Sequence, residues 1–335
     1  MASIEGPADP AEVAARTGGF GDRLAERVAA RESQLVLGLD PDPARLWPAA
    51  LDPQPEALDP EALGPGNEAA GEVTIAERAA RAVAAHCALV IAATAEQCVA
   101  AKLQVACFER LGAAGWAALA GTVTVARDHG LLVIADAKRG DVDVTAAAYA
   151  QAFLGETATP FGTVPGLGAD ALTVNPLLGR DSLEPLVTAA RAGGGGLFVL
   201  VRTSNPGAAD VQERRLAGGE AVSDRLAELV DEIGSAGIGR SGLSDIGAVV
   251  GATAPGRLSA LRERMPHTVF LLPGVGAQGG RVEELAPAFA PGPAGGLVSA
   301  SRGIVAAHER IGGDPAGAAA REASRLRELA WRLTA

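Results

Sequence analysis

The chain has 335 residues, a length that suits one α/β barrel domain with insertions. Apolar residues make up 48% of the chain and aromatic residues only 3%, so a large core would be built mainly from Ala, Val and Leu. The formal net charge of −11 argues against a broad nucleic-acid-binding surface, although a few basic side chains could still bind a small anion locally.

The cysteines, histidines and N-terminal residues indicate a cytoplasmic protein without a metal site. Cys87, Cys98 and Cys107 form no CxxC pair, so we expect reduced, structural thiols. None of the four histidines lies at metal-ligand spacing from another. No basic segment followed by an apolar run opens the sequence, so we expect no secretory signal. The apolar stretch 82–95 is too short to span a bilayer and predicts a buried helix instead of a membrane contact.

Short apolar runs recur along the chain, and segments with helical patterns separate them. Eight of these runs are continuous rather than alternating, as in parallel strands that are covered on both faces. They occupy residues 34–39, 98–103, 131–135, 171–174, 197–201, 246–250, 268–272 and 296–299. The helix candidates between them include residues 75–94, 116–129, 182–192, 221–235 and 254–264. Eight strand–helix units in one chain predict a (β/α)8 barrel, or TIM barrel.

Two stretches interrupt this repeating order. Residues 41–71 are rich in Pro, Ala, Asp and Glu, and we predict a long insertion loop there, after the first strand. Residues 156–168 are rich in Gly, Thr and Pro, and we predict a loop before the fourth strand. Residues 1–33 are expected to form an N-terminal helical segment. Because no linker divides the chain, we predict a single domain over residues 1–335.

Polar side chains follow the predicted strands, at the end of a barrel where functional residues gather. Carboxylates, ammonium groups and a guanidinium would therefore meet on one rim. The residues at these positions are Asp40, Lys102, Asp136, Lys138, Asn175, Thr203, Ser204, Gln278, Ser301, Arg302 and Gly303.

The densest group of charges is the segment Asp136-Ala-Lys138-Arg-Gly-Asp141. Asp136 and Lys138 are two residues apart at a strand end, so their side chains can point to the same face. A lysine held between carboxylates stays protonated and can donate a proton. The carboxylate would repel an anionic substrate group while the lysine attracts a developing carbanion, and that difference between ground and transition state is catalytic. A simple ion pair at the rim is the alternative, and Lys102 and Arg302 on other strands favour catalysis.

Several segments share their sequence and order with one known family. They are Phe20-Gly-Asp-Arg-Leu, Leu37-Gly-Leu-Asp40-Pro, Lys102-Leu-Gln-Val-Ala-Cys-Phe108-Glu109, Asp136-Ala-Lys138-Arg-Gly-Asp141, Thr173-Val-Asn175-Pro-Leu-Leu-Gly179, Thr203-Ser204-Asn205-Pro206, Val250-Gly-Ala-Thr-Ala-Pro255 and Leu272-Pro-Gly-Val-Gly-Ala-Gln278-Gly-Gly280. Over nearly its whole length the chain resembles the orotidine 5′-phosphate decarboxylase family, specifically its type 2 branch. The resemblance implies conversion of orotidine 5′-monophosphate to uridine 5′-monophosphate and CO2, without metal or organic cofactor, by a homodimer with shared active sites.

The resemblance also implies which residues perform the reaction. Lys138 would be the general acid that protonates C6 of the pyrimidine after CO2 leaves. Asp136 would lie against the substrate carboxylate. Lys102 and Asp141 would complete an alternating array of charges, with Asp141 reaching in from the neighbouring subunit.

Other residues would hold the sugar and the base. Asp40 and Lys102 would bind the ribose hydroxyls. Thr145, four residues after Asp141, would contact the ribose across the dimer. Ser204 would read the edge of the pyrimidine.

The phosphate would be held at the last strands of the barrel. Arg302 and the backbone N–H of Gly303 would grip it, since a planar guanidinium matches a face of phosphate oxygens. Shorter family members carry an arginine right after the Pro-Gly of strand seven, where this chain has Pro273-Gly-Val-Gly. Gln278 or backbone N–H groups would serve there instead, with a simple Gly-rich turn as the other interpretation. Gln212 is a further candidate for closing over the substrate.

Two other functions are compatible with the same segments. Related barrels that act on sugar phosphates also carry a DxKxxD segment but bind magnesium through additional acids, and Glu109 lies where such an acid could serve. Lys102, Ser204 and Asn205 favour the nucleotide over the sugar phosphate. A catalytically silent nucleotide-binding scaffold is the third possibility, and the complete array of charges argues against it.

Overall fold

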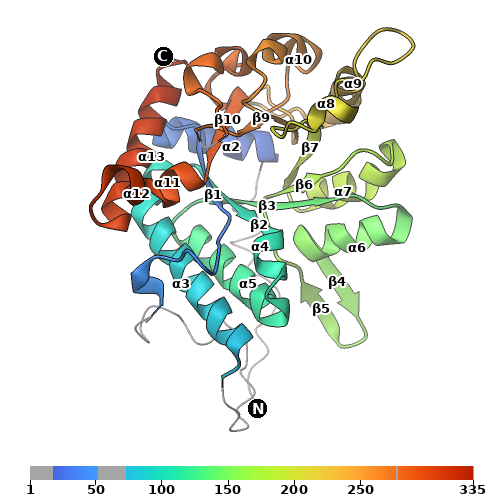
Figure 1. Ribbon diagram of the computed structural model, residues 1–335. Coiled ribbons are helices and arrows are strands. Elements are labelled where there is room, and N and C mark those ends of the chain that lie inside the picture. Colours follow the sequence, from blue (N-terminus) through green and yellow to red (C-terminus); the bar gives the residue numbers. More distant parts are fainter. Residues whose placement is uncertain (1–17, 52–72, 277, 335) are drawn as a thin grey trace.

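A computed structural model describes residues 18–51, 73–276 and 278–334. Its centre is a closed barrel of parallel strands in the order β1-β10-β9-β8-β7-β6-β3-β2 (Figure 1). The strands are β1 (Leu35–Leu39), β2 (Ala100–Gln104), β3 (Leu132–Arg139), β6 (Ala171–Val174), β7 (Gly196–Arg202), β8 (Ile246–Val250), β9 (Phe270–Pro273) and β10 (Gly296–Ala300). Each of the eight predicted apolar runs overlaps one of these strands, and the predicted (β/α)8 barrel is confirmed.

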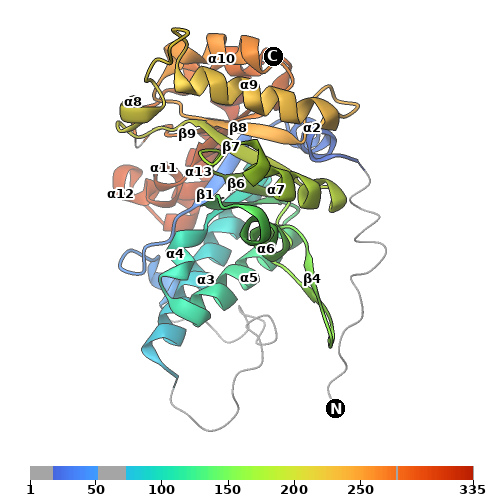
Figure 2. The same ribbon diagram turned by 90° about the vertical axis from the view of Figure 1, so that its right-hand side faces the viewer.

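Helices surround the barrel, as Figures 1 and 2 show. They are α2 (Phe20–Arg31), α3 (Ile75–Thr94), α4 (Val105–Glu109), α5 (Gly112–Asp128), α6 (Asp143–Phe153), α7 (Arg180–Ala192), α8 (Ala208–Val211), α9 (Val222–Gly234), α10 (Leu258–Arg264), α11 (Arg302–Val305), α12 (Ala307–Ile311) and α13 (Pro315–Trp331). With helices outside and side chains filling the inside, strands such as β1, β8 and β10 are buried at every residue. That double burial explains why their sequences are continuously apolar.

Helix α3 is the clearest helix signal in the sequence. Thr74 and Glu77 form a capping box at its start, in which each side chain accepts a hydrogen bond from the other residue's backbone N–H. With the turn that follows it, the helix (Ile75–Gln97) is long and apolar enough to cross a membrane by length and composition. However, 56% of its apolar window is buried inside the protein, and it packs against α5 and α13. It is therefore the buried helix predicted over residues 82–95.

One end of the barrel is closed by the N-terminal helix α2. Phe20, Leu24 and Val28 of this helix are fully buried in a cluster at the N-terminal ends of the strands. The ring of Phe20 meets the ring of Phe198 edge-on, with centroids 5.8 Å apart. Among the described residues, this end of the barrel is therefore filled by apolar side chains.

The loop predicted over residues 156–168 is wrong for most of its length. It contains an antiparallel hairpin of β4 (Glu156–Thr159) and β5 (Gly162–Pro165), which projects away from the barrel (Figure 2). Its residues are largely exposed, and Phe161 at the turn is 99% exposed. Strands without a buried face need no apolar run, so hydrophobicity could not reveal them.

The predicted insertion loop after the first strand is described only in part. Residues 40–51 leave β1 and form one short 3-10 turn, η1 (Pro48–Ala50). The remainder of the predicted loop, residues 52–71, lies outside the described residues, as do residues 1–17 of the predicted N-terminal helical segment.

Candidate active site

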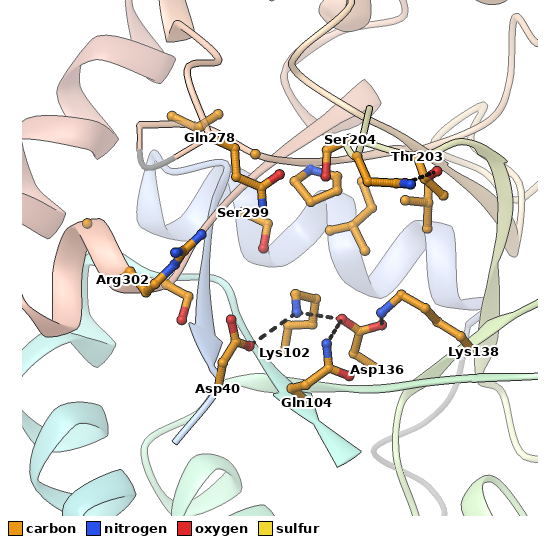
Figure 3. Close-up of a pocket in the computed structure, with 18 residues that line it drawn as sticks. Asp40, Lys102, Gln104, Asp136, Lys138, Thr203, Ser204, Gln278, Ser299 and Arg302 are labelled. Atoms are coloured by element: carbon orange, nitrogen blue, oxygen red, sulfur yellow. Dashed lines mark hydrogen bonds and ion pairs between the residues drawn. The ribbon is translucent and has the colours of Figure 1, made fainter. Parts of the chain in front are cut away.

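A cavity of about 300 Å³ lies at the C-terminal ends of the barrel strands. Its lining is polar on several sides (Figure 3). The lining residues are Asp40, Lys102, Gln104, Asp136, Lys138, Thr203, Ser204, Asn205, Val249, Leu271, Pro273, Gly274, Val275, Gln278, Ser299, Ser301, Arg302 and Gly303. The structure thus brings together most of the predicted site residues, from six different strand ends. Those absent from the lining are Asp141, Thr145, Asn175 and Gln212.

Asp136 is the centre of a charged cluster, which we define as Asp40, Lys102, Asp136 and Lys138. The ammonium of Lys102 lies 2.6 Å from Oδ2 of Asp136 and 3.8 Å from Oδ1 of Asp40. The ammonium of Lys138 donates to the other oxygen of Asp136, Oδ1, at 2.5 Å. Figure 3 shows the four side chains in a row along one wall of the cavity. One carboxylate therefore holds two cations apart at fixed positions.

Burial distinguishes the two lysines of the charged cluster. The side chain of Lys102 is 8% exposed, whereas that of Lys138 is 41% exposed. Lys102 is a fixed charge packed into the barrel, while Lys138 ends at the open part of the cavity. Both lysines line the cavity, and Lys138 is the more exposed of the two.

The charged cluster also fixes the ionisation of its members. Burial by itself raises the pKa of Asp136, but the ammonium groups of Lys102 and Lys138 outweigh burial and hold that pKa well below its ordinary value. Burial by itself lowers the pKa of Lys102, yet the carboxylates of Asp136 and Asp40 raise it above its ordinary value. Asp136 is thus an anion and Lys102 a cation at neutral pH. Fixed charges of this kind stabilise a developing charge without reorganising.

The backbone at Lys138 departs from a regular strand. Lys138 has a φ of 50°, in the left-handed region that residues with a side chain rarely occupy. The pairing of β3 with β6 shifts its register at the same place, between Ala135 and Arg139. Non-glycine residues held in such conformations cluster at functional sites.

The opposite wall of the cavity carries hydrogen-bonding groups instead of a packed ion pair. Ser204 and Gln278 face the charged cluster across the cavity, and Arg302 lies at the side next to Asp40 (Figure 3). Gly274, with a φ of 99°, lies between two of these residues. A Cβ added to Gly274 would come within 3.0 Å of the Ser204 Cβ and 3.2 Å of the Gln278 side-chain oxygen. The glycine therefore keeps this wall open for a ligand.

Four predicted residues lie outside the cavity, and one of them, Asn175, accepts a hydrogen bond from the backbone N–H of Leu177 at 3.0 Å. Asp141 accepts a hydrogen bond from the backbone N–H of Val142 at 2.8 Å, and Thr145 lies exposed on α6. The side chain of Gln212 accepts a hydrogen bond from the backbone N–H of Thr203 at 2.7 Å. Gln212 thus stabilises the end of β7, next to Ser204.

Gln104, Thr173 and Ser299 were not predicted, although all three bear on the site. Gln104 and Ser299 line the cavity. The Gln104 amide lies 3.4 Å from Oδ2 of Asp136, and the Thr173 hydroxyl donates to Oδ1 of Asp136 at 2.9 Å. Gln104 could have been found, because it is two residues after Lys102 on one strand and shares its face.

The acid that a magnesium-dependent relative would need is otherwise engaged. Glu109 forms an ion pair with Arg139 and does not line the cavity. No group of three His, Cys, Asp or Glu side chains that could hold a metal ion occurs among residues 18–51, 73–276 and 278–334. Cys87, Cys98 and Cys107 are free thiols, as predicted. Burial raises the pKa of Cys87 and of Cys98 to about 12, so both stay protonated.

Comparison with known proteins decides the family of this barrel. The family model described as "Orotidine 5'-phosphate decarboxylase / HUMPS family" matches residues 33–316. The chain belongs to this family. The match spans every strand of the barrel and every residue of the charged cluster.

Individual members of the family are similar over most of their length. An orotidine 5′-phosphate decarboxylase of Rhodopirellula baltica is 44% identical over 231 residues, 69% of this chain and 75% of the relative. One of Haloarcula marismortui is 40% identical over 291 residues, 87% of this chain and 88% of the relative. The solved structure of Leishmania donovani OMP decarboxylase is 30% identical with a TM-score of 0.67, covering 93% of this chain and 99% of that one.

Proposed function

We propose that Lys138 supplies the proton that replaces CO2 when this chain converts orotidine 5′-monophosphate to uridine 5′-monophosphate. The chain is an orotidine 5′-phosphate decarboxylase, a carboxy-lyase of pyrimidine biosynthesis, as its family and its similar relatives show. The observation that carries the role of Lys138 is its ammonium, which contacts Asp136 at 2.5 Å and still reaches the open cavity.

The charged cluster suits a reaction in which negative charge moves from a carboxylate to a carbon. A substrate carboxylate placed beside the buried anion Asp136 is repelled in the ground state. Once CO2 leaves, the charge lies on C6 of the ring, next to the ammonium of Lys138, which stabilises it and then donates a proton. Interactions that strengthen only on the way to the transition state raise the rate.

The rest of the cavity suits the remainder of the nucleotide. In this proposal Asp40 and Lys102 bind the ribose hydroxyls, and Ser204 binds the pyrimidine edge. A guanidinium is a strong partner for a phosphate, so the phosphate would lie at Arg302, with the Gly303 N–H and Gln278 beside it. All of these residues line the same cavity. Binding energy from the phosphate would position the ring against the charged cluster.

Asp141 and Thr145 belong to this proposal only through a second copy of the chain. Neither residue lines the cavity of its own chain, and Thr145 is exposed. Val142 and Val144 beside them are 48% and 76% exposed, which gives this face apolar surface for another protein. We therefore propose a homodimer in which Asp141 and Thr145 complete the partner's site.

We also propose a single-domain, cytoplasmic enzyme of the type 2 branch, supported by the shared segments and the free thiols.

Turnover of purified enzyme tests the proposed roles of Lys138 and Asp141 together. Lys138→Ala is expected to lose activity by many orders of magnitude, because both the proton donor and the carbanion's counter-charge disappear. Asp141→Asn is expected to be impaired as well. Mixing these two variants should restore part of the activity, since one of the two sites in a mixed dimer would contain Lys138 from one chain and Asp141 from the other.

Several outcomes would contradict the proposal. Near-equal activity of wild type and Lys138→Ala would remove Lys138 from its role. Absence of recovery on mixing, with mixed dimers shown to form, would place Asp141 outside the partner's site. Loss of turnover with a chelator would favour the magnesium-dependent sugar-phosphate reaction. Binding of uridine monophosphate with no turnover of orotidine monophosphate would indicate a silent scaffold.

A further inference from the structure

The junction of β3 and β6 is irregular where it carries Lys138. Ala135 pairs with Leu172, and the next paired residues are Arg139 and Val174. Three residues of β3 therefore stand opposite the single residue Thr173 of β6. Two extra residues on one side form a bulge, which removes regular backbone partners and redirects the side chains.

Thr173 fills the place that this bulge leaves open. Its hydroxyl accepts a hydrogen bond from the backbone N–H of Lys138 at 2.9 Å. The same hydroxyl donates to Oδ1 of Asp136 at 2.9 Å. Thr173 is 1% exposed, so water does not compete for either bond. One side chain thus links the backbone of one charged residue to the carboxylate of the other.

Both linked groups need such a partner. The backbone of Lys138 lies in the left-handed region, which persists only where surrounding contacts fix it. Asp136 is 5% exposed, and its Oδ1 accepts bonds from Lys138 and Thr173 at once. Without the hydroxyl, the Lys138 N–H would lose its acceptor and Oδ1 would lose one of its donors. Both changes would let the ammonium and the carboxylate reorient.

We propose that Thr173 is a positioning residue for decarboxylation, holding Asp136 and the bulged backbone of Lys138 in the arrangement that the reaction requires. This inference rests on the proposed roles of Asp136 and Lys138. Thr173 does not line the cavity and so acts through these two residues, not on the substrate. A positioning role affects the chemical step more than binding, because it concerns groups that act in the transition state.

Three variants test this role: Thr173→Val, Thr173→Ser and, as a control, Thr122→Val. Thr173→Val keeps the shape but removes the hydroxyl, and kcat is expected to fall by roughly 10- to 100-fold, the loss expected for a hydrogen bond to a charged group. Binding of uridine monophosphate should stay within about threefold of wild type, since groups at the substrate's other end are untouched. Thr173→Ser keeps the hydroxyl and should restore most of kcat.

The control variant separates positioning from general damage to the core. Thr122 is equally buried, at 2% exposed, and its hydroxyl donates to the Ala118 carbonyl within α5, away from the cavity. Thr122→Val should leave kcat unchanged. Thermal unfolding of all variants identifies any that fail to fold. If Thr173→Val fails, the kcat of Thr173→Ser compared with that of wild type still tests whether a hydroxyl at this position is sufficient for the reaction.

The outcomes distinguish this inference from the proposed function. Wild-type kcat in folded Thr173→Val, or equal losses in Thr173→Val and Thr173→Ser, would overturn the role of the hydroxyl while leaving the decarboxylase intact. A loss confined to uridine monophosphate binding would also overturn it, because that would be a binding role. If the wild-type protein itself did not turn over orotidine 5′-monophosphate, the proposed function would be refuted, and this inference with it.

Discussion

Buried charges occur at both ends of the barrel, but their partners differ. At the N-terminal end, Arg262 is 6% exposed and donates four hydrogen bonds to backbone carbonyls, with its guanidinium 3.7 Å from the centroid of Phe270. Arg23 and Asp170 form a single pair there, at 2.8 Å. At the C-terminal end, Asp136 holds two ammonium groups beside a cavity.

This difference separates charges that maintain the fold from the charges for which we propose a catalytic role. The N-terminal charges are enclosed, and each has partners from the chain itself. The charged cluster has an open side, and the side chain of Lys138 remains 41% exposed. The burial of Asp136 and Asp170 alone would not distinguish the two ends of the barrel, whereas the cavity beside Asp136 does.

The largest expected effect comes from neutralising one carboxylate at each end. Asp136→Asn should lower kcat by on the order of 10³-fold or more, because the two lysines lose the anion that separates them and repels the substrate. Asp170→Asn is the matched variant at the N-terminal end, where Oδ2 accepts the Val133 N–H. It should keep kcat but lose roughly 2–3 kcal/mol of unfolding free energy.

Steady-state kinetics and denaturant unfolding of both variants would check this contrast. A large loss of kcat in Asp170→Asn, or full activity in Asp136→Asn, would break the division between the two ends.

The next largest effect is expected at Arg262. Burial lowers the pKa of this guanidinium to about 9, but it remains charged at neutral pH. Arg262→Met would leave four buried carbonyls without their donor, and the unfolding free energy should fall by about 3 kcal/mol or more. The kcat of the folded protein should not change. Denaturant unfolding measures the first quantity, and a stability equal to wild type would show that water or neighbouring donors replace the guanidinium.

A smaller effect, dependent on pH, is expected from His86. This side chain is buried, and its Nδ1 accepts a hydrogen bond from the backbone N–H of Trp47 at 3.0 Å. Burial lowers the pKa of His86 to about 4 from 6.5. Between pH 6.5 and 4 the unfolded chain therefore binds a proton that the folded chain does not, so this contribution to stability is lost as the pH falls through that window.

The unfolding free energy at pH 5 and pH 7 tests the effect of His86. The histidine should account for a loss of about 2 kcal/mol on going from pH 7 to pH 5. His86→Gln keeps an acceptor for the backbone N–H of Trp47 but cannot titrate. Its loss of unfolding free energy between pH 7 and pH 5 should therefore be about 2 kcal/mol smaller than that of wild type. Equal pH dependence of the two proteins would show that the folded protein protonates His86 as readily as the unfolded chain.

The sequence allowed prediction of the barrel because its signal is hydrophobic and local. Strands covered on both faces are continuously apolar, and all eight were located in this way. The hairpin around Phe161 was missed because its strands have no buried face. The end of β3 extends to Arg139, four residues past the predicted run, because the strand continues through Asp136 and Lys138, whose side chains line the cavity.

The candidate site was predictable to the extent that it lies in short sequence segments. Asp136 and Lys138 share one segment, and their neighbours Lys102 and Arg302 follow other strands. Thr173 lies inside an apolar run, and its role depends on a register shift that only the paired strands reveal. No pattern in one sequence shows which residue faces a bulge in the neighbouring strand.

The way the barrel closes has a consequence for how the protein is made. The first strand, β1, pairs with the last, β10, and this pairing brings Asp40 and Arg302 to one cavity. A ribosome that has synthesised the chain as far as β9 has already produced the whole charged cluster, yet β1 and β9 are still unpaired edges open to association with other chains. Chains that end before β10, whether from a truncated message or from proteolysis, would therefore be insoluble fragments instead of partly active enzyme.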